Sequence, residues 1–428
     1  MSLIYSSMSR QALESVMSES KAVYDGYVSQ KLKLNMSRGR PCAEQLDLTR
    51  DMLSVIGPDS DFAASSLDVR NYGGLTGIDE IKDIFAPIIG AEKDEIIAAG
   101  NSSLNLMYDL VADGMLYGYS ESTPWTAQSK RIKFICPAPG YDRHFAICEM
   151  LGIEMLTVKM NSDGPDMDEV CSLCENDESI KGIWCVPKYS NPTGVTFSDN
   201  VVRRFAEMSP KAKDFRIFWD NSYVIHDLNA ESDHLLNLFD ELKVRGKEDE
   251  LFMFTSTSKI TFAGAGIAFA AMSKANIKLV SSRLSIRTIG YDKINQLRHV
   301  RYFKNTKNIY DHMRLHANIL RPKFKLVDDI LSARLSGTGI ASWTKPNGGY
   351  FISLDLMPGT AKRTWSLAKD AGVILTNVGA TFPYGKDPAD SNIRIAPTNV
   401  TLNELETALE VLCVCSKIAA CEKLLSNK

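Results

Sequence analysis

Apolar residues follow two rhythms along this chain from about residue 75 onward. Short runs rich in β-branched and aromatic residues alternate with stretches in which apolar positions recur every three or four residues, the period of a helix. Strands are predicted at 131–136, 154–159, 182–186, 215–219, 251–255 and 266–272, and a helix at 141–152. Strands separated by helices require crossover connections, which predict an α/β fold with a mainly parallel central sheet.

The pattern changes beyond about residue 275, where the helical period dominates. A long helical segment is predicted at 294–335. A mixed stretch follows, with strands at 349–356 and 392–397, a helix at 362–372 and a closing helix from Leu402. We therefore predict an N-terminal segment 1–60 that joins the smaller domain, a large domain at 61–330, and a small α+β domain at 331–428.

Composition narrows the class of protein. Of the 428 residues, 44% are apolar and 24% are charged, with a net charge of −3, which is ordinary for a globular protein. No basic excess points to nucleic acid, and no apolar run reaches the ~20 residues that span a bilayer. The first 21 residues lack the apolar core of a signal peptide.

The cysteines add little chemistry. Their number is nine, and they are spread through apolar segments, which indicates a reducing cytoplasm. Cys171 and Cys174 form a Cys-x-x-Cys pair, but no second pair or nearby His completes a metal site. We expect two helical residues there and no bound metal.

Lys259 is the first candidate for catalysis. It ends Ser-Thr-Ser-Lys (256–259), which follows the apolar run 251–254 and precedes Phe-Ala-Gly-Ala-Gly (262–266). A lysine that leaves water at a strand end has a lowered pKa, and its neutral amine can form a Schiff base with an aldehyde cofactor. A solvated strand-end lysine fits the same residues, so the motifs upstream decide between the two interpretations.

Asp220 closes the predicted strand 215–219. Burying its carboxylate is costly unless it meets a cation, and a protonated pyridine nitrogen is such a partner. Tyr223 lies three residues further on and could reach the same ring. A helix-capping Asp explains the position equally well.

Asn191 lies in Asn-Pro-Thr-Gly (191–194), a turn that follows the strand 182–186. Ligands of parallel sheets bind at the carboxyl ends of the strands, so Asn191, Asp220 and Lys259 could converge on one crevice. Asn101, Ser102 and Ser103 open an amphipathic helix, where free N–H groups can bind a phosphate. Ser256 could add a hydroxyl, although an ordinary N-cap also explains residues 101–103.

Two further residues could border the crevice. Tyr141, in Pro-Ala-Pro-Gly-Tyr (137–141), follows a strand and could cover a planar cofactor or pack in the core. Arg394 alternates with Ile393 and Ile395 and therefore faces away from their apolar side. An arginine fork binds a carboxylate in two places, and a surface position is the alternative.

Together these motifs resemble the fold-type-I pyridoxal-phosphate (PLP) enzymes, class I/II aminotransferases, over roughly residues 30–400. The resemblance implies a three-layer α/β fold and PLP as the cofactor. It implies that Lys259 carries the cofactor, Asp220 pairs with the pyridine nitrogen, and Asn191 and Tyr223 bind the ring hydroxyl. The residues that it assigns to the phosphate are Asn101, Ser102, Ser103, Ser256 and Ser258.

The same resemblance assigns the remaining contacts. Tyr141 would stack on the ring, and Arg394 would bind the α-carboxylate of the substrate. Gly39 and its neighbour Arg38 would lie near the substrate. Tyr72 matches the tyrosine that reaches the phosphate of a neighbouring subunit, which implies a homodimer with shared sites.

One departure concerns the phosphate. Family members carry an arginine a few residues after the lysine, whereas this chain has Gly266 at the best-matched position. Arg298 or His299 is our candidate for the missing cation. The stretches 257–266, 295–299 and 384–388 resemble a narrower bacterial subgroup that is similar to the aminotransferase-like domain of MocR regulators but stands alone, and some of its members are aspartate aminotransferases.

These observations lead to a hypothesis of transamination between an L-amino acid and a 2-oxo acid by ping-pong kinetics, with L-aspartate and 2-oxoglutarate as the preferred pair. Lys259 would move the Cα proton, because one base must reach both atoms. A dicarboxylate needs a second cation, and the candidates are Arg38, Arg40 and Lys386. The alternatives are aromatic or broad amino-acid specificity, β-elimination or decarboxylation, and a non-catalytic PLP-binding amino-acid sensor. The last is disfavoured because no basic cluster precedes the Tyr72 motif.

Overall fold

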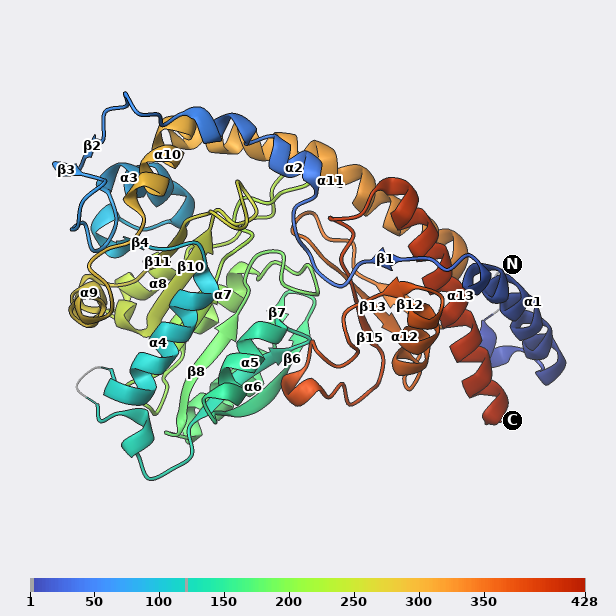
Figure 1. Cartoon of the computed structure of the whole chain (residues 1–428). Coiled ribbons are helices and arrows are strands. Elements are labelled where there is room, and N and C mark those ends of the chain that lie inside the picture. Colours follow the sequence, from blue (N-terminus) through green and yellow to red (C-terminus); the bar gives the residue numbers. More distant parts are fainter. Residues whose placement is uncertain (1–3, 120–121, 428) are drawn as a thin grey trace.

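The computed structural model describes residues 4–119 and 122–427 and contains a large mixed sheet with helices on both faces (Figure 1). Its strands, in spatial order, are β4 (Ile96–Ala98), β11 (Ala268–Ala271), β10 (Leu251–Ser256), β9 (Arg216–Asp220), β8 (Ile180–Cys185), β5 (Lys133–Ala138), β6 (Glu154–Asn161) and β7 (Gly164–Pro165). The pairs from β10 to β6 are parallel, while β11 and β7 are antiparallel to their neighbours. The prediction of a mainly parallel sheet is therefore confirmed. The short strand β4 was not predicted.

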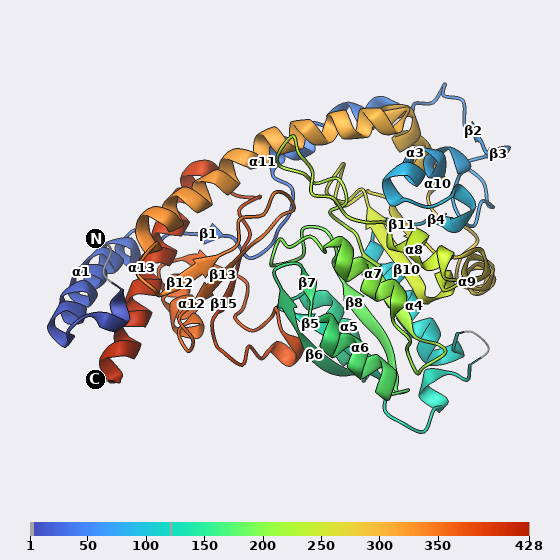
Figure 2. The same ribbon diagram turned by 180° about the vertical axis from the view of Figure 1, so that it is seen from behind.

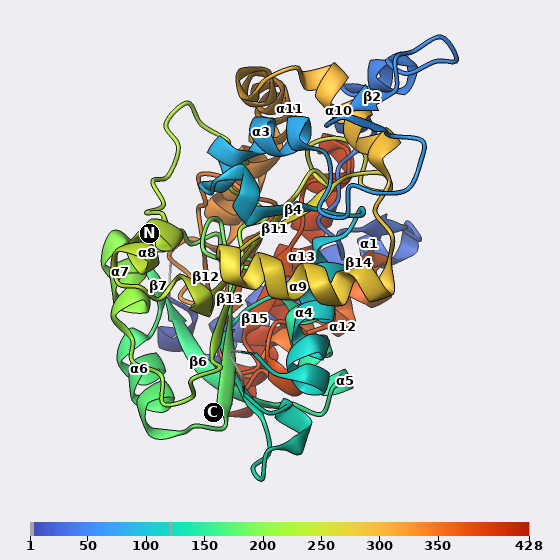
Figure 3. The ribbon, with the colours of Figure 1, turned by 90° about the vertical axis from the view of Figure 1, so that its left-hand side faces the viewer.

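The central strands are apolar throughout because both faces of the sheet are covered. In β9, Ile217 and Trp219 face one hydrophobic cluster and Phe218 faces the other. The first cluster is completed by α3 (Asp79–Ile89), α6 (Met167–Asn176), α7 (Asp199–Glu207), α8 (Leu238–Val244) and α10 (Lys293–Phe303). The second is completed by α4 (Ser103–Tyr117), α5 (Asp142–Met150) and α9 (Lys274–Arg287). Figure 3 shows the resulting layers, with α6, α7 and α8 on one side of the sheet and α4 and α5 on the other.

The predicted helical segment 294–335 is two helices, not one. The first is α10, and α11 (Thr306–Leu335) begins after a break at Lys304, whose φ is 65°. The Asn305 side chain caps α11 by accepting a hydrogen bond from the backbone N–H of Asn308 (3.0 Å). A left-handed residue followed by an Asn cap ends one helix and starts the next, a local signal that the apolar period alone does not carry.

A second, smaller unit is built around an antiparallel sheet of β12 (Ala341–Trp343), β13 (Ile352–Leu356) and β15 (Asn392–Ile395). Its other elements are α12 (Ala361–Asp370), α13 (Leu402–Ser426), and the N-terminal α1 (Arg10–Ser29) and β1 (Leu34–Asn35), of which β1 pairs with β14 (Val373–Ile374). The helix α1 lies beside α13 (Figures 1 and 2). The long helix α11 connects this unit with the large sheet, since Ile309 and Met313 belong to one core and Leu320 to the other. The division at residues 60 and 330 stays a prediction.

Shorter elements complete the N-terminal part. They are α2 (Ala43–Asp47) and the hairpin of β2 (Ala63–Ala64) and β3 (Leu67–Asp68). Cys171 and Cys174 lie on α6, as expected, and both are free thiols. Across residues 4–119 and 122–427, no helix combines the length and apolarity needed to cross a membrane.

Phe218 gives the fold a quantitative test. Its ring is fully buried and lies 4.7 Å from Trp184 and 5.6 Å from both Phe134 and Phe252, measured between ring centroids. We expect Phe218→Ala to lower the free energy of unfolding by about 3–5 kcal/mol, because the cavity cannot close within a packed sheet. Urea unfolding measures this change. Ile286→Ala, at an exposed position, should change it by less than about 0.5 kcal/mol.

Candidate functional site

A cavity of about 660 Å³ opens where the parallel strands end, between the large sheet and the smaller unit. Asp220 is the last residue of β9, Ser256 is the last of β10, and Lys259 follows it by three residues. The predicted residues that line this cavity are Arg38, Gly39, Asn101, Ser102, Ser103, Tyr141, Asn191, Asp220, Tyr223, Ser256, Ser258, Lys259 and Arg394. Tyr72, which was expected at the phosphate of a neighbouring subunit, does not line the cavity of its own chain and is 76% exposed.

Lys259 lies beside two buried aromatic rings and close enough to Asp220 to be influenced by its charge. Its Nζ lies 4.9 Å from the centre of the Tyr223 ring and 5.8 Å from that of Tyr350. Desolvation lowers the pKa of Lys259, and the nearby charge of Asp220 opposes part of that shift. A lysine with a lowered pKa supplies more neutral amine, the form that attacks an aldehyde.

Asp220 is buried, and its two oxygens have different partners. Oδ2 lies 3.1 Å from His144 Nε2, and Oδ1 accepts a hydrogen bond from the Ser222 hydroxyl (2.5 Å). The His144 ring is itself buried and stacks on Trp184 at a centroid distance of 4.4 Å. This packing fixes the carboxylate at the cavity wall. There it can accept a further hydrogen bond, from a protonated ring nitrogen.

Tyr223 is buried beside this carboxylate. Burial raises the pKa of its phenol well above the ordinary value, with further contributions from Tyr141 and Asp220. The phenol therefore stays protonated and can act as a hydrogen-bond donor at neutral pH.

The start of α4 forms a seat for an anion. The Ser102 hydroxyl accepts from the N–H of Asn105, Ser256 donates to Ser258 (3.1 Å), and Ser258 donates to the carbonyl of Asn101 (3.3 Å). These hydroxyls surround the positive end of a 15-residue helix that opens into the cavity.

The seat has no arginine, and the structure shows why. A Cβ atom on Gly266 would lie 2.9 Å from Thr257 Oγ1 and 3.2 Å from the backbone nitrogen of Ser258. The Thr257 hydroxyl cannot move freely, because it accepts a hydrogen bond from the N–H of Ile267 (2.8 Å). Any side chain at position 266 would displace this turn.

The candidates for a replacement cation are not supported. His299 and Arg298 do not line the cavity. His299 is buried against the hydroxyls of Thr257 and Thr261, and desolvation lowers its pKa to about 4, so it is neutral at neutral pH. Arg298 instead donates to the side chain of Asn295 (2.5 Å). The prediction that His299 is the phosphate cation is therefore wrong. The same prediction for Arg298 has no geometric support.

Arg394 lines the cavity from the smaller unit. It is buried on β15, and its guanidinium donates from Nη1 to Asp142 (2.9 Å) and Asn191 (3.2 Å) and from Nη2 to Thr376 (3.1 Å). Its Cζ lies 4.8 Å from the centre of the Phe351 ring. That ring also packs on Gly39, where a Cβ would come within 2.5 Å of Phe351 Cζ, so any other residue there would displace the ring.

Sequence reasoning missed several residues of the cavity wall. They are Ser37, Asp142, Arg143, Ser222, Phe351, Thr376 and Asn377, together with His144 behind Asp220. His144 lies on α5, three residues after the N-cap Tyr141, a spacing that could have revealed it. Asp142 and Arg143 are the first two residues of the same helix, and the remaining residues come from loops whose approach depends on packing. Arg40 and Lys386, proposed as second cations, do not line the cavity.

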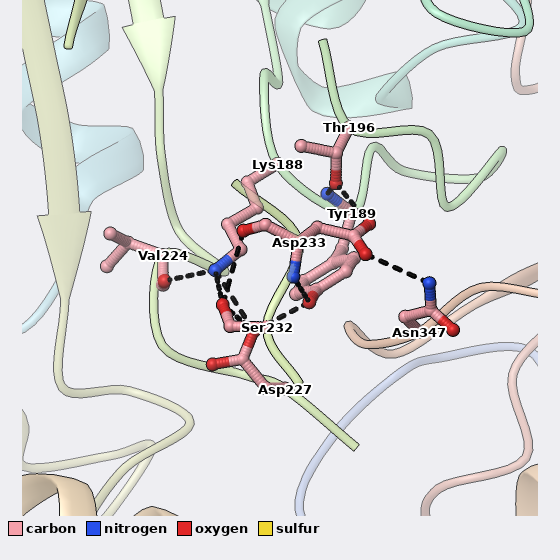
Figure 4. Close-up of polar contacts among 8 residues, drawn as sticks. All are labelled: Lys188, Tyr189, Thr196, Val224, Asp227, Ser232, Asp233 and Asn347. Atoms are coloured by element: carbon pink, nitrogen blue, oxygen red, sulfur yellow. Dashed lines mark hydrogen bonds and ion pairs between the residues drawn. The ribbon is translucent and has the colours of Figure 1, made fainter. Parts of the chain in front are cut away.

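A polar network behind the cavity connects three loops (Figure 4). Lys188 is buried and donates to the carbonyl of Val224 (3.0 Å) and the hydroxyl of Ser232 (2.8 Å), and its Nζ lies 3.0 Å from Asp227. Tyr189 donates to Asp227 as well (2.6 Å). The donors of Lys188 are thus all satisfied away from water.

The network extends to the smaller unit through Asp233. Its carboxylate accepts hydrogen bonds from Thr196 and from Asn347, each at 2.9 Å (Figure 4). The three connected loops carry Asn191, Tyr223 and Phe351, which all line the cavity. Hydrogen bonds remote from the cavity therefore position residues of its wall.

Comparison with known proteins agrees with this geometry. The sequence model of the family described as aspartate amino-transferase matches residues 8–428. An aspartate aminotransferase of Corynebacterium glutamicum is 44% identical over 94% of this chain and 93% of its own. The protein belongs to the aspartate amino-transferase family and is an aminotransferase.

Solved structures support the same assignment. A crystal structure of an aspartate transaminase from Corynebacterium glutamicum is 42% identical, with a TM-score of 0.96 over 99% of this chain and 100% of that one. An α-aminoadipate aminotransferase of Thermus thermophilus has a TM-score of 0.73 at 17% identity, over 92% of this chain and 94% of its own. At that identity the likeness shows the fold alone.

The Lys188 network predicts a large effect of one substitution. Lys188→Met should lower the free energy of unfolding by about 3–5 kcal/mol, because it leaves the carboxylate of Asp227 without its buried cation. Urea unfolding of the purified protein measures the change.

Two controls isolate the cause. Lys345→Met removes an ion pair with Asp328 that is largely exposed, and it should cost less than about 1 kcal/mol. The double variant Lys188→Met/Asp227→Asn should recover part of the loss, since no unpaired charge remains. Equal effects of the two lysine substitutions would contradict the role of the buried pair.

Proposed function

We propose that the protein exchanges an amino group between L-aspartate and 2-oxoglutarate with PLP as its cofactor. The observation that carries this proposal is the meeting, in one cavity, of Lys259 with its lowered pKa, the buried Asp220 and the guanidinium of Arg394. The choice of aspartate rests on the name of the 44% identical relative.

The residues of the cavity fit the cofactor. The seat at the start of α4 suits its phosphate, with Asn101, Ser102, Ser103, Ser256 and Ser258 as the binding set. Asp220 suits its ring nitrogen, Asn191 and Tyr223 suit its ring hydroxyl, and Tyr141 suits one face of the ring. When bound, PLP supplies the electron sink that makes the Cα–H bond of an amino acid labile.

The chain itself would supply binding and proton transfer. Lys259 would hold the cofactor aldehyde through Nζ and, once free, would take the Cα proton of the substrate and return it at a neighbouring atom. Asp220, held in place by its contact with His144, would stabilise a positive charge beside its carboxylate. Arg394 binds the α-carboxylate, beside Gly39 and Phe351. Both half-reactions would use the same site, so the first product must leave before the second substrate binds, which gives ping-pong kinetics.

A dicarboxylate substrate needs a second cation at the cavity wall. Arg38 fulfils this requirement among the three candidates from the sequence, because it lines the cavity whereas Arg40 and Lys386 do not. Arg143 lines it too. We propose Arg38, supported by Arg143, as the site for the side-chain carboxylate of aspartate.

The proposal also covers the assembly of the protein into a homodimer, its location in the cell and its subgroup within the family. Tyr72 is exposed and does not line the cavity of its own chain, which suits a residue that completes the phosphate site of a second subunit in a homodimer. The free thiols of all nine cysteines suit a reducing cytoplasm. The motifs around Lys259 support membership in the stand-alone subgroup that is similar to MocR domains.

Titration of the visible absorption band of the PLP-loaded protein tests the proposal. The band should bleach with L-aspartate and return with 2-oxoglutarate, and Lys259→Ala should lower the rate of both changes by roughly four orders of magnitude because the proton-transfer base is lost. Lys274→Ala, which removes an exposed lysine paired with Asp94, should leave both rates unchanged. A wild-type band that answers only to other amino acids would overturn the substrate pair, and a Lys259→Ala protein that keeps its rate would overturn the mechanism.

Arg38→Ala tests the second carboxylate site. The loss of one charge-assisted contact should lower kcat/KM for aspartate roughly 100-fold, while kcat/KM for alanine, which has no second carboxylate, changes less than threefold. Steady-state kinetics with both amino acids measure this difference. Arg143→Ala provides the comparison, and equal losses for aspartate and alanine would contradict a role in side-chain recognition.

A further inference from the structure

The guanidinium that is proposed to bind substrate already has an acidic partner. Asp142 Oδ1 lies 2.9 Å from Arg394 Nη1, and the same Nη1 donates to Asn191. Nη2 donates to Thr376, and Nε is buried without a partner among the described residues. Nη1 therefore already donates to two protein groups, one of which is a carboxylate.

This pairing conflicts with the binding of a carboxylate. A substrate carboxylate at Nη1 and Nη2 would lie beside that of Asp142, and adjacent like charges in a partly buried site cost several kcal/mol. Arg394 is buried, so water screens this repulsion poorly. Both carboxylates cannot occupy the Nη1 position together.

Asp142 has a second favourable environment. It is the first residue of α5, where the unpaired N–H groups of the helix end favour a negative charge. Its side chain is 29% exposed, so it has room to turn, and its neighbour Arg143 lines the same cavity. The carboxylate can therefore leave Arg394 without becoming an unpaired buried charge.

We propose that Asp142 is a placeholder: it neutralises Arg394 in the empty site and is displaced by the α-carboxylate of the substrate. This inference rests on the proposed function, since it takes Arg394 as the carboxylate site. Displacement lowers the affinity for every carboxylate substrate in both half-reactions and speeds the release of the product. It also weakens the binding of other anions that would compete with the substrate for Arg394.

Binding of maleate, a dicarboxylate that cannot be transaminated, tests this role in the PLP-loaded protein by calorimetry. Asp142→Asn should bind maleate about tenfold more tightly than wild type, because the competing charge is gone. Asp199→Asn is the matched control: Asp199 is the first residue of α7, as Asp142 is of α5, and it pairs with Arg203 at the surface. It should leave the affinity unchanged. Unchanged or weaker binding by Asp142→Asn would overturn the proposal.

A crystal structure of the wild-type protein with maleate gives an independent answer that needs no variant. We expect a maleate carboxylate at Nη1 of Arg394 and Asp142 turned toward the start of α5. Maleate bound at Arg394 with Asp142 still on Nη1 would overturn the placeholder and leave the proposed function intact. Maleate that binds equally well to Arg394→Ala would instead overturn the proposed carboxylate site.

Discussion

The burial of one negative charge, on Asp220, is the constraint around which this site is organised. A carboxylate away from water is stable only with partners, and here they come from different parts of the chain: the imidazole of His144 on α5 and the hydroxyl of Ser222 in the following loop. Trp184 holds the imidazole by stacking. The same carboxylate moderates the fall in the pKa of Lys259. Changes in the central sheet that move Asp220 would therefore also alter the pKa of Lys259.

Close packing of side chains against the backbone explains two glycines at and near the cavity. Gly266 excludes a side chain because Thr257 occupies the space, and Gly39 excludes one because Phe351 does. The first contact leaves the anion seat to hydroxyls and to the N–H groups at the start of α4. The second brings the N-terminal segment against the smaller unit, where Arg394 lies.

Charge inside the cavity is arranged in pairs rather than as a simple positive surface. Arg394 pairs with Asp142, and the carboxylate of Asp220 contacts His144 and accepts a hydrogen bond from Ser222. Lys188 and Asp227 form a further buried pair behind the loops. Such pairs lower the cost of burial while the site is empty, and they set how much of each charge is available to a ligand. Affinity in this protein depends on which pairs a ligand can replace.

The order of residues alone predicted the parallel sheet, because strand-like runs alternate with helical stretches, and it predicted Lys259, Asp220 and Asn191 at strand ends. These are local signals of period and position. Packing decided the rest: Arg394 and Asp142 are 252 residues apart, His144 reaches Asp220 across 76, and Lys304 interrupts a helix that the apolar period runs through. Contacts between distant segments depend on how helices and loops pack against the sheet, and no local sequence pattern encodes that geometry.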